Sequence, residues 1–111
     1  MNTVGTDDLR LMVENNQDFE LINVLSEEEF QSNHIPDSIN IPLSADDFVK
    51  KVEQQAGSKE RKIVVYCASS SCDASPKAAK KLEEAGFNNV LDYEGGIKAW
   101  QESGLTVEAG A

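Results

Sequence analysis

Cys67 and Cys72 are the two cysteines of this sequence, and they lie five positions apart in a segment of small residues. Small side chains allow the backbone of residues 67–73 to turn so that its N–H groups form a concave site for an anion. A thiol at the centre of such a site has a lowered pKa, because amide dipoles and the start of a following helix favour negative charge. We therefore expect Cys67 to be a thiolate at neutral pH and to face solvent. The residues expected to bind its substrate, mainly through their amides, are Ala68, Ser69, Ser70, Ser71, Cys72 and Asp73.

A thiolate in this setting can attack the sulfur atom of a donor and hold it as a persulfide. The N–H groups that favour the thiolate would also stabilise the terminal sulfur of that intermediate. The alternative interpretation is that Cys67 is a small buried residue that ends a strand, since free cysteines are often buried and inert. The position between a strand and a helix favours the reactive interpretation.

Cys72 has two interpretations that the sequence leaves open. Two cysteines can form a disulfide when their Cα atoms lie within about 7 Å, and a curved loop can bring this pair to that distance. In the first interpretation, Cys72 is a resolving or relay thiol that releases the sulfur of a Cys67 persulfide or accepts it. In the second interpretation, Cys72 is a small loop residue without a catalytic role.

Strand and helix patterns alternate along the chain. Short apolar runs predict strands at residues 21–24, 38–41, 62–66 and 90–93. The intervening helices are predicted to begin at the capping residues Thr6, Ser26, Ser44 and Ser75, and a last helix follows Gly95-Gly96. This alternation indicates an α/β fold with a mostly parallel sheet, in which ligands bind beyond the carboxyl ends of the strands. Cys67 directly follows the most apolar strand and is therefore expected at that edge.

The composition argues against several other classes of protein. The chain has 111 residues, with 10 basic and 20 acidic side chains and a formal charge of −10. Phosphate binding requires clustered lysine and arginine, so we expect neither nucleic acid nor a membrane surface as a partner. No apolar run reaches the roughly 20 residues of a membrane span, and the first residues do not resemble a signal peptide. We expect one domain, residues 1–111, in the cytoplasm.

Metal and cofactor chemistry are not expected from these residues. A zinc site needs four ligands, whereas the chain has two thiols and a single histidine, His34. The pair Gly95-Gly96 is too short and wrongly placed for a dinucleotide-binding loop. The sequence therefore predicts chemistry carried by cysteine alone.

Three segments resemble the signatures of the rhodanese-like (sulfurtransferase) family, and they occur in the family's order. They are residues 21–43, the strand that leads to Cys67, and Gly95-Gly96-Ile97-Lys98-Ala99-Trp100. The resemblance extends roughly from Val4 to Val107. It implies a three-layer fold with a five-stranded, mostly parallel sheet and helices on both faces. It also implies that Cys67 transfers sulfane sulfur through a persulfide.

The loop after Cys67 departs from the family pattern in ways that bear on the substrate. It is about two residues longer than the common form, and it has no arginine or lysine before Lys77. A wider loop with less positive charge, in a chain of charge −10, disfavours the dianion thiosulfate as the natural donor. Related phosphatases place an arginine six positions after the cysteine, where this chain has Asp73, so phosphatase activity is not expected.

The resemblance predicts a sulfurtransferase that moves sulfane sulfur from a persulfide, a polysulfide or thiosulfate to a thiophilic acceptor. Its partners would be a small sulfur-containing substrate or a protein that donates or accepts sulfur. The alternative function is that of a non-catalytic or redox-sensing module, in which a protein partner reads the state of Cys67 and Cys72. The loss of the basic loop residue favours this alternative a little. His34, which falls in the first signature, is expected to be structural.

Overall fold

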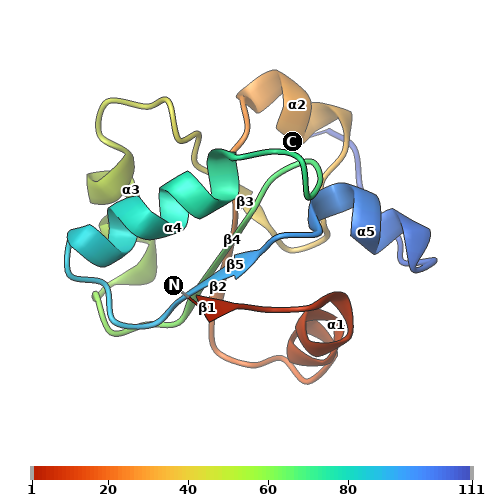
Figure 1. The fold of residues 1–111 in the computed structure, drawn as a ribbon, viewed down its shortest axis with the longest axis horizontal. Helices are drawn as coiled ribbons and strands as arrows, with labels where there is room; N and C mark the ends of the chain where they lie inside the picture. The colour runs from red at the N-terminus through yellow and green to blue at the C-terminus, as the bar shows by residue number, and fades with distance from the viewer. Residues whose placement is uncertain (1, 111) are drawn as a thin grey trace.

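A parallel sheet of five strands runs through the computed structural model, which describes residues 2–110 of the chain (Figure 1). The strands are β1 (Asn2–Thr3), β2 (Glu20–Asn23), β3 (Ile39–Asn40), β4 (Ile63–Tyr66) and β5 (Val90–Tyr93). Their order in the sheet is β1-β5-β4-β2-β3, and every neighbouring pair is parallel. The α/β fold with a parallel sheet is therefore confirmed, and β4 is its central strand.

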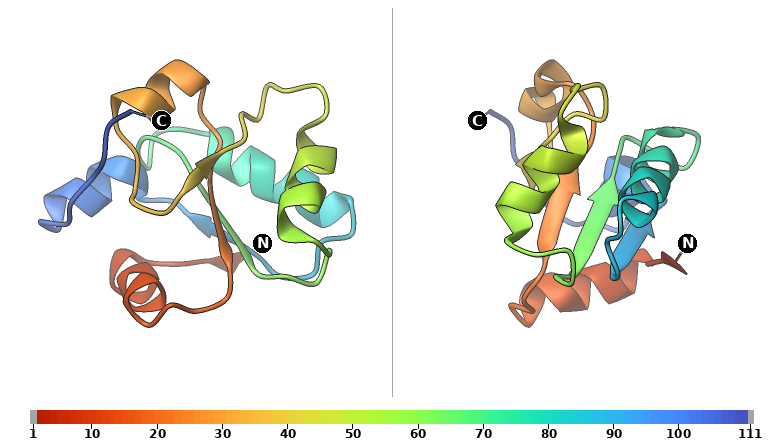
Figure 2. Two further views of the ribbon diagram at one scale, coloured as in Figure 1. Left: turned by 180° about the vertical axis from the view of Figure 1, so that it is seen from behind. Right: turned by 90° about the vertical axis from the view of Figure 1, so that its left-hand side faces the viewer.

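Helices cover both faces of the sheet. They are α1 (Thr6–Glu14), α2 (Glu27–Ser32), α3 (Phe48–Ala56), α4 (Ala74–Glu84) and α5 (Gly96–Glu102). In Figure 2, α3 and α4 lie on one side of the sheet, and α1 and α5 lie on the other. Each pair buries apolar side chains against its own face of the sheet, which gives two separate apolar clusters. The three layers implied by the family resemblance are therefore present.

The central strand β4 is buried on both faces because its side chains alternate between the two clusters. Ile63 and Val65 pack with α3 and α4, whereas Val64 and Tyr66 pack with α1 and α5. All four side chains are fully buried. A strand between two helical layers needs apolar residues at every position, which explains the continuous apolar run in the sequence.

The predicted caps at Thr6 and Ser75 and the predicted helix start at Ser44 are wrong, and long-range contacts explain the two errors in the caps. The hydroxyl of Thr6 lies 2.7 Å from the hydroxyl of Tyr93, and Gly5 occupies the cap position of α1. The hydroxyl of Ser75 lies 3.5 Å from the sulfur of Cys67, and α4 begins one residue earlier, at Ala74. The cap predicted at Ser26 is confirmed, because its hydroxyl accepts a hydrogen bond from the backbone N–H of Glu29.

The third error concerns the helix predicted to begin at Ser44. Residues 42–48 form consecutive turns, in which the N–H of Ala45 bonds to the carbonyl of Pro42 and the N–H of Phe48 to that of Ala45. The regular helix α3 starts only at Phe48. Strand β1 was not predicted, because two exposed residues carry no apolar pattern and are ordered by pairing with β5.

The start of α5 packs directly against the backbone that follows β4. The N–H groups of Ile97 and Lys98 donate hydrogen bonds to the carbonyl oxygens of Cys67 and Ala68, at 3.1 and 2.9 Å. Gly96 has a φ of +64°, and a Cβ at this position would collide with the carbonyl oxygen of Cys67. Glycine is therefore required here both for its backbone conformation and for the close approach of two backbone segments.

Gly96→Ala is expected to destabilise the protein by at least about 2 kcal/mol more than Gly104→Ala, because only Gly96 adds a collision with backbone to the left-handed conformation. Gly104 is the matched control, since its φ is +81° and a Cβ there would meet no atom within 4 Å. The free energy of unfolding in urea measures both losses. Equal losses in the two variants would show that the contact with the Cys67 loop is not tight.

Candidate active site

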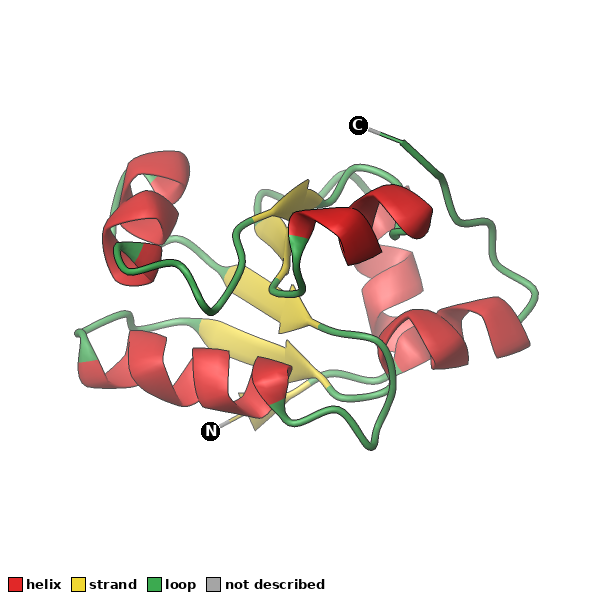
Figure 3. Ribbon diagram, turned by 90° about the horizontal axis from the view of Figure 1, so that it is seen from above, coloured by secondary structure: helices red, strands yellow, loops and turns green. Residues whose placement is uncertain are grey.

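Cys67 lies at the carboxyl end of the central strand, at the edge of the sheet where ligands bind in folds of this class. The segment 67–73 joins β4 to α4, the longest helix of the described chain. In Figure 3, the loop leaves the tip of a central strand and curves back to the helix beside it. The side chain of Cys67 belongs to the apolar cluster on the α3 and α4 face of the sheet.

The two cysteines are bonded to each other in this structure. A disulfide joins Cys67 and Cys72, whose Cα atoms lie 6.4 Å apart. The close approach that the spacing allowed is therefore present. Cys67 is 0% exposed and Cys72 is partly exposed, so the expectation that Cys67 faces solvent as a thiolate is wrong for this form. The physical reason is that its sulfur is bonded to Cys72, which leaves no thiol to ionise, and that its side chain packs within the apolar cluster on the α3 and α4 face.

The loop amides differ in whether they are free to bind a ligand. The N–H of Cys72 donates to the carbonyl of Ser69 at 3.0 Å and is occupied in this form. The N–H groups of the four preceding residues, 68–71, have no backbone acceptor within residues 2–110. Ala68, Ser70 and Ser71 are exposed, so this stretch of backbone lies at the surface. Four consecutive unpaired amides are a suitable set of donors for an anion.

The last loop residue, Asp73, forms an ion pair with Lys77 one helical turn further on, at 3.0 Å. The hydrogen bond and the charge of Lys77 lower the pKa of Asp73 below its usual value. Both side chains are well exposed, so this pair contributes little to stability. The pair matters for the charge at the loop, because Lys77, the first basic residue after Cys67, is already paired with a carboxylate.

Two buried polar residues next to Cys67 were missed by the sequence analysis. Ser75 is buried in the first turn of α4, and its hydroxyl oxygen lies 3.5 Å from the sulfur of Cys67. Asp92 is fully buried in β5, beside Val65 of β4. Burial raises the pKa of Asp92, and a hydrogen bond from Ser75 opposes this rise. An acidic residue inside an otherwise apolar strand was the sequence signal for this site.

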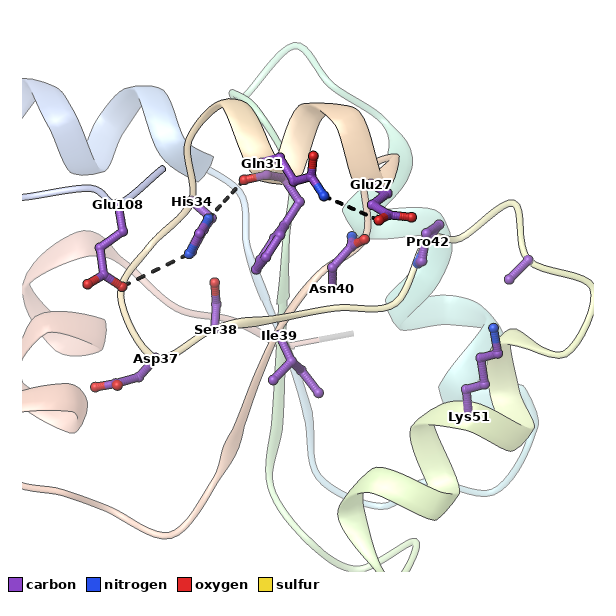
Figure 4. Close-up of a pocket in the computed structure, with 12 residues that line it drawn as sticks. Glu27, Gln31, His34, Asp37, Ser38, Ile39, Asn40, Pro42, Lys51 and Glu108 are labelled. Carbon is purple, nitrogen blue, oxygen red and sulfur yellow. Dashed lines mark hydrogen bonds and ion pairs between the residues drawn. The ribbon is translucent and has the colours of Figure 1, made fainter. Parts of the chain in front are cut away.

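A small cavity of about 310 Å³ adjoins the Cys67 loop. Its walls include Ala68 from the loop, Lys98 from α5 and Glu29 from α2. A larger cavity of about 760 Å³ lies around His34, Ser38 and Glu108 and contains neither cysteine (Figure 4). The smaller cavity also contains neither cysteine, and Ala68 is the residue through which it adjoins the loop.

His34 is held by packing and hydrogen bonds. Its ring stacks on Phe30 with the ring centres 3.9 Å apart, and its Nδ1 lies 2.8 Å from the carbonyl oxygen of the same residue. Its Nε2 lies 4.0 Å from a carboxyl oxygen of Glu108 (Figure 4). These contacts agree with a structural role. Within residues 2–110, no three His, Cys, Asp or Glu side chains gather in a group that could hold a metal ion.

The described chain contains no helix that is both long enough and apolar enough to span a membrane. This finding concerns residues 2–110 alone.

Proteins similar to this chain include a sulfurtransferase and a transcriptional regulator. It is 27% identical over 109 residues to a sulfurtransferase of Allochromatium vinosum, a match that covers 98% of this chain and 96% of that protein. It is also 34% identical over 91 residues to an HTH-type transcriptional regulator of Mycobacterium tuberculosis. This match covers 82% of this chain and only 38% of the regulator. The chain thus spans well under half of that second protein.

A solved structure and a family model agree with these relatives. The crystal structure of a thiosulfate sulfurtransferase from Pseudomonas aeruginosa matches with a TM-score of 0.88 at 21% identity, over 100% of this chain and 21% of that one. At this identity the likeness establishes the fold alone. The model of the rhodanese-like domain matches residues 6–103, which include the loop and both segments that support it. This chain belongs to the rhodanese-like domain family.

Proposed function

We propose that this protein is a sulfurtransferase that carries sulfane sulfur on Cys67 as a persulfide. The observation that carries the proposal is the position of Cys67 at the carboxyl end of the central strand, followed by unpaired loop amides and then by α4. Membership of the rhodanese-like family and the likeness to a sulfurtransferase support it. The amides of Ala68 to Asp73 are the groups that we assign to the bound sulfur anion.

The reaction begins with the dithiol form of the protein, which a dithiol reductant produces from the disulfide. The thiolate of Cys67 attacks the outer sulfur of a donor R–S–SH, and the S–S bond of the donor breaks. The products are the Cys67 persulfide and the thiolate R–S⁻, so atoms, charge and electrons balance. The loop amides stabilise the negative charge on the terminal sulfur when the persulfide ionises. A thiophilic acceptor then removes this sulfur.

The electrostatics of the site favour a donor with little negative charge. The chain has a formal charge of −10, and the first basic residue after Cys67 is paired with Asp73. Lys98 lines the adjoining cavity, but Glu29 lines the same cavity. A persulfide or polysulfide, free or carried by a donor protein, therefore suits the site better than the dianion thiosulfate.

Cys72 is assigned the role of a resolving thiol in this proposal. Its thiolate attacks the Cys67 sulfur of the persulfide and displaces HS⁻, and the disulfide between Cys67 and Cys72 forms. This is the bond present in the structure. The same chemistry requires a reductant for the next cycle, which a reducing cytoplasmic compartment would supply.

A redox-sensing module is the second candidate function. The observation that favours it is the disulfide, which buries Cys67 and leaves Cys72 partly exposed. The relative from Mycobacterium tuberculosis is a transcriptional regulator by name, so a domain of this family also occurs within a regulatory protein. In this function a protein partner distinguishes the dithiol from the disulfide, and no sulfur is transferred.

Sulfur loading tests the first function directly. Reduced Cys72→Ser protein, incubated with glutathione persulfide, is expected to gain one sulfur atom, and Cys67→Ser is expected to gain none, because only Cys67 is the carrier. Intact-mass spectrometry measures the gain, and cyanide should remove it. If Cys72→Ser gains no sulfur from glutathione persulfide, polysulfide or thiosulfate, the protein is not a sulfurtransferase and the sensing function remains.

Release of sulfide tests the role of Cys72. After loading and removal of the donor, the parent protein is expected to release sulfide and form the disulfide, because the two thiols are held within reach of each other. Cys72→Ser is expected to release sulfide at least about tenfold more slowly, since it loses the intramolecular attack. Sulfide is measured by methylene blue formation. Equal release rates would remove Cys72 from the mechanism while leaving Cys67 as the carrier.

A further inference from the structure

The disulfide presents two sulfur atoms to an incoming thiol, and they differ in access. Cys67 is 0% exposed, so no atom of its side chain meets solvent. Cys72 is partly exposed, and its neighbours in the loop, Ser71 and Asp73, are exposed. Access is one of the properties that decide which sulfur of a disulfide is attacked. The two ends of this bond are therefore not equivalent toward a thiol.

Several contacts hold Cys67 in the interior. Its side chain packs in the apolar cluster on the α3 and α4 face, and its carbonyl oxygen accepts a hydrogen bond of 3.1 Å from the N–H of Ile97. Its sulfur has two polar neighbours besides the sulfur of Cys72. They are the hydroxyl oxygen of Ser75 at 3.5 Å and the carbonyl oxygen of Cys72 at 3.6 Å. A thiol can reach this sulfur only after the surrounding elements have separated.

Cys72 lies in a more open setting, between the end of β4 and the start of α4. Its N–H bonds to the carbonyl of Ser69 at 3.0 Å, which holds it in a turn of the loop. The only charged residue of the loop, Asp73, forms an ion pair of 3.0 Å with Lys77. The charge of Asp73 is therefore balanced, and the loop itself does not repel an anionic thiolate.

The geometry of thiol–disulfide exchange strengthens this difference. A thiolate attacks one sulfur and displaces the other sulfur in line with the new bond. Attack on Cys67 would have to come from the side opposite Cys72, which the apolar cluster occupies. Attack on Cys72 comes from the side opposite Cys67, and this side faces away from the buried partner. The open approach therefore leads to Cys72.

We propose that Cys72 is a modification site, at which an external thiol opens the disulfide and remains bound as a mixed disulfide. A thiolate R–S⁻ bonds to the sulfur of Cys72, and the bond to Cys67 breaks. Its electron pair leaves with the sulfur of Cys67, which becomes a thiolate, so atoms, charge and electrons balance. The hydroxyl of Ser75 lies 3.5 Å from this sulfur and can donate a hydrogen bond to the thiolate. The inference rests on the disulfide alone and goes beyond both candidate functions.

The thiol has two possible sources, a small monothiol and a protein that carries a dithiol. With a dithiol, the second thiol attacks the mixed disulfide and releases Cys72 as a free thiol. With a monothiol, a second molecule performs this step, in competition with Cys67, which lies within reach and closes the disulfide again. The mixed disulfide on Cys72 is the intermediate common to both sources.

Differential labelling tests where the thiol attacks. The disulfide form is mixed with glutathione, stopped with acid at successive short times, and its free thiols are labelled with N-ethylmaleimide. The mixed disulfides are then reduced and labelled with iodoacetamide. Both cysteines lie in the tryptic peptide of residues 63–77, and its fragment masses show which cysteine carries which label. Extrapolated to zero time, iodoacetamide on Cys72 with N-ethylmaleimide on Cys67 is expected to exceed the reverse pattern at least about tenfold.

The same protein unfolded in concentrated urea is the matched control. Its disulfide and the sequence around it are unchanged, but both sulfur atoms are accessible. The preference for Cys72 is therefore expected to fall to about threefold or less. This comparison separates access in the folded structure from any effect of neighbouring residues.

A second probe distinguishes the two sources of the thiol. Thioredoxin whose second active-site cysteine is replaced by serine stays attached to the sulfur that it attacks, and we expect to find it on Cys72. Its rate constant is compared with that of glutathione at equal thiolate concentration. Adducts on Cys72 from both probes support the proposal, and the larger rate constant identifies the source that suits the site better.

The proposal is overturned if the two label patterns are equal or reversed in the folded protein, or if folded and unfolded protein give the same ratio. It is also overturned if neither probe opens the disulfide of the folded protein. Sulfur loading takes no part in these measurements. Attack at Cys72 in a protein that carries no sulfur would contradict the proposed function alone. Sulfur loading on Cys67 together with glutathione on Cys67 would contradict this inference alone.

Discussion

The contact between Gly96 and the carbonyl group of Cys67 determines where the candidate site lies. Two segments that are distant in the sequence approach so closely there that a single Cβ would collide with backbone. Two hydrogen bonds from α5 to Cys67 and Ala68 hold the first part of the loop, and α4 holds its end. The loop is therefore fixed at both ends by helices on opposite faces of the sheet, while its exposed middle stays accessible.

The sulfur of Cys67 is subject to two opposing requirements. A nucleophile has to meet its substrate, yet the strand that positions Cys67 ends inside an apolar cluster and leaves the side chain fully buried when it is bonded to Cys72. The pair has two chemical states, the disulfide present in the structure and the dithiol that reduction would produce. Transfer of sulfur and sensing of redox state would use the same two states and would differ in what approaches the loop.

The parts of the fold that depend on local pattern were predictable from the sequence. The continuous apolar run of β4 and the spacing of Ile97 and Trp100 in α5 are local signals that also fix the position of Cys67. The errors occur where a side chain has a distant partner. Thr6 and Ser75 look like helix caps, but their hydroxyls meet Tyr93 and Cys67 instead, and only the folded chain reveals these partners.

The candidate site, like the fold, was predictable from the sequence only where it depends on local pattern. The spacing of the cysteines allowed a disulfide, but it did not predict that Cys67 would be fully buried in the disulfide form. Asp92 is an acidic residue within an apolar strand, and only the folded sheet shows that it is fully buried beside Val65 of β4. Sequence patterns locate Cys67 at the end of β4, whereas the buried polar groups around it come from packing between elements.

The outermost strands of the sheet, β1 and β3, are only two residues long. An edge strand exposes unpaired N–H and carbonyl groups on which another chain can add itself as a further strand. With edges this short, and with Pro42 closely following β3, the sheet offers a second copy almost no template for growth. The short edges of the sheet thus disfavour association of two copies through their backbones.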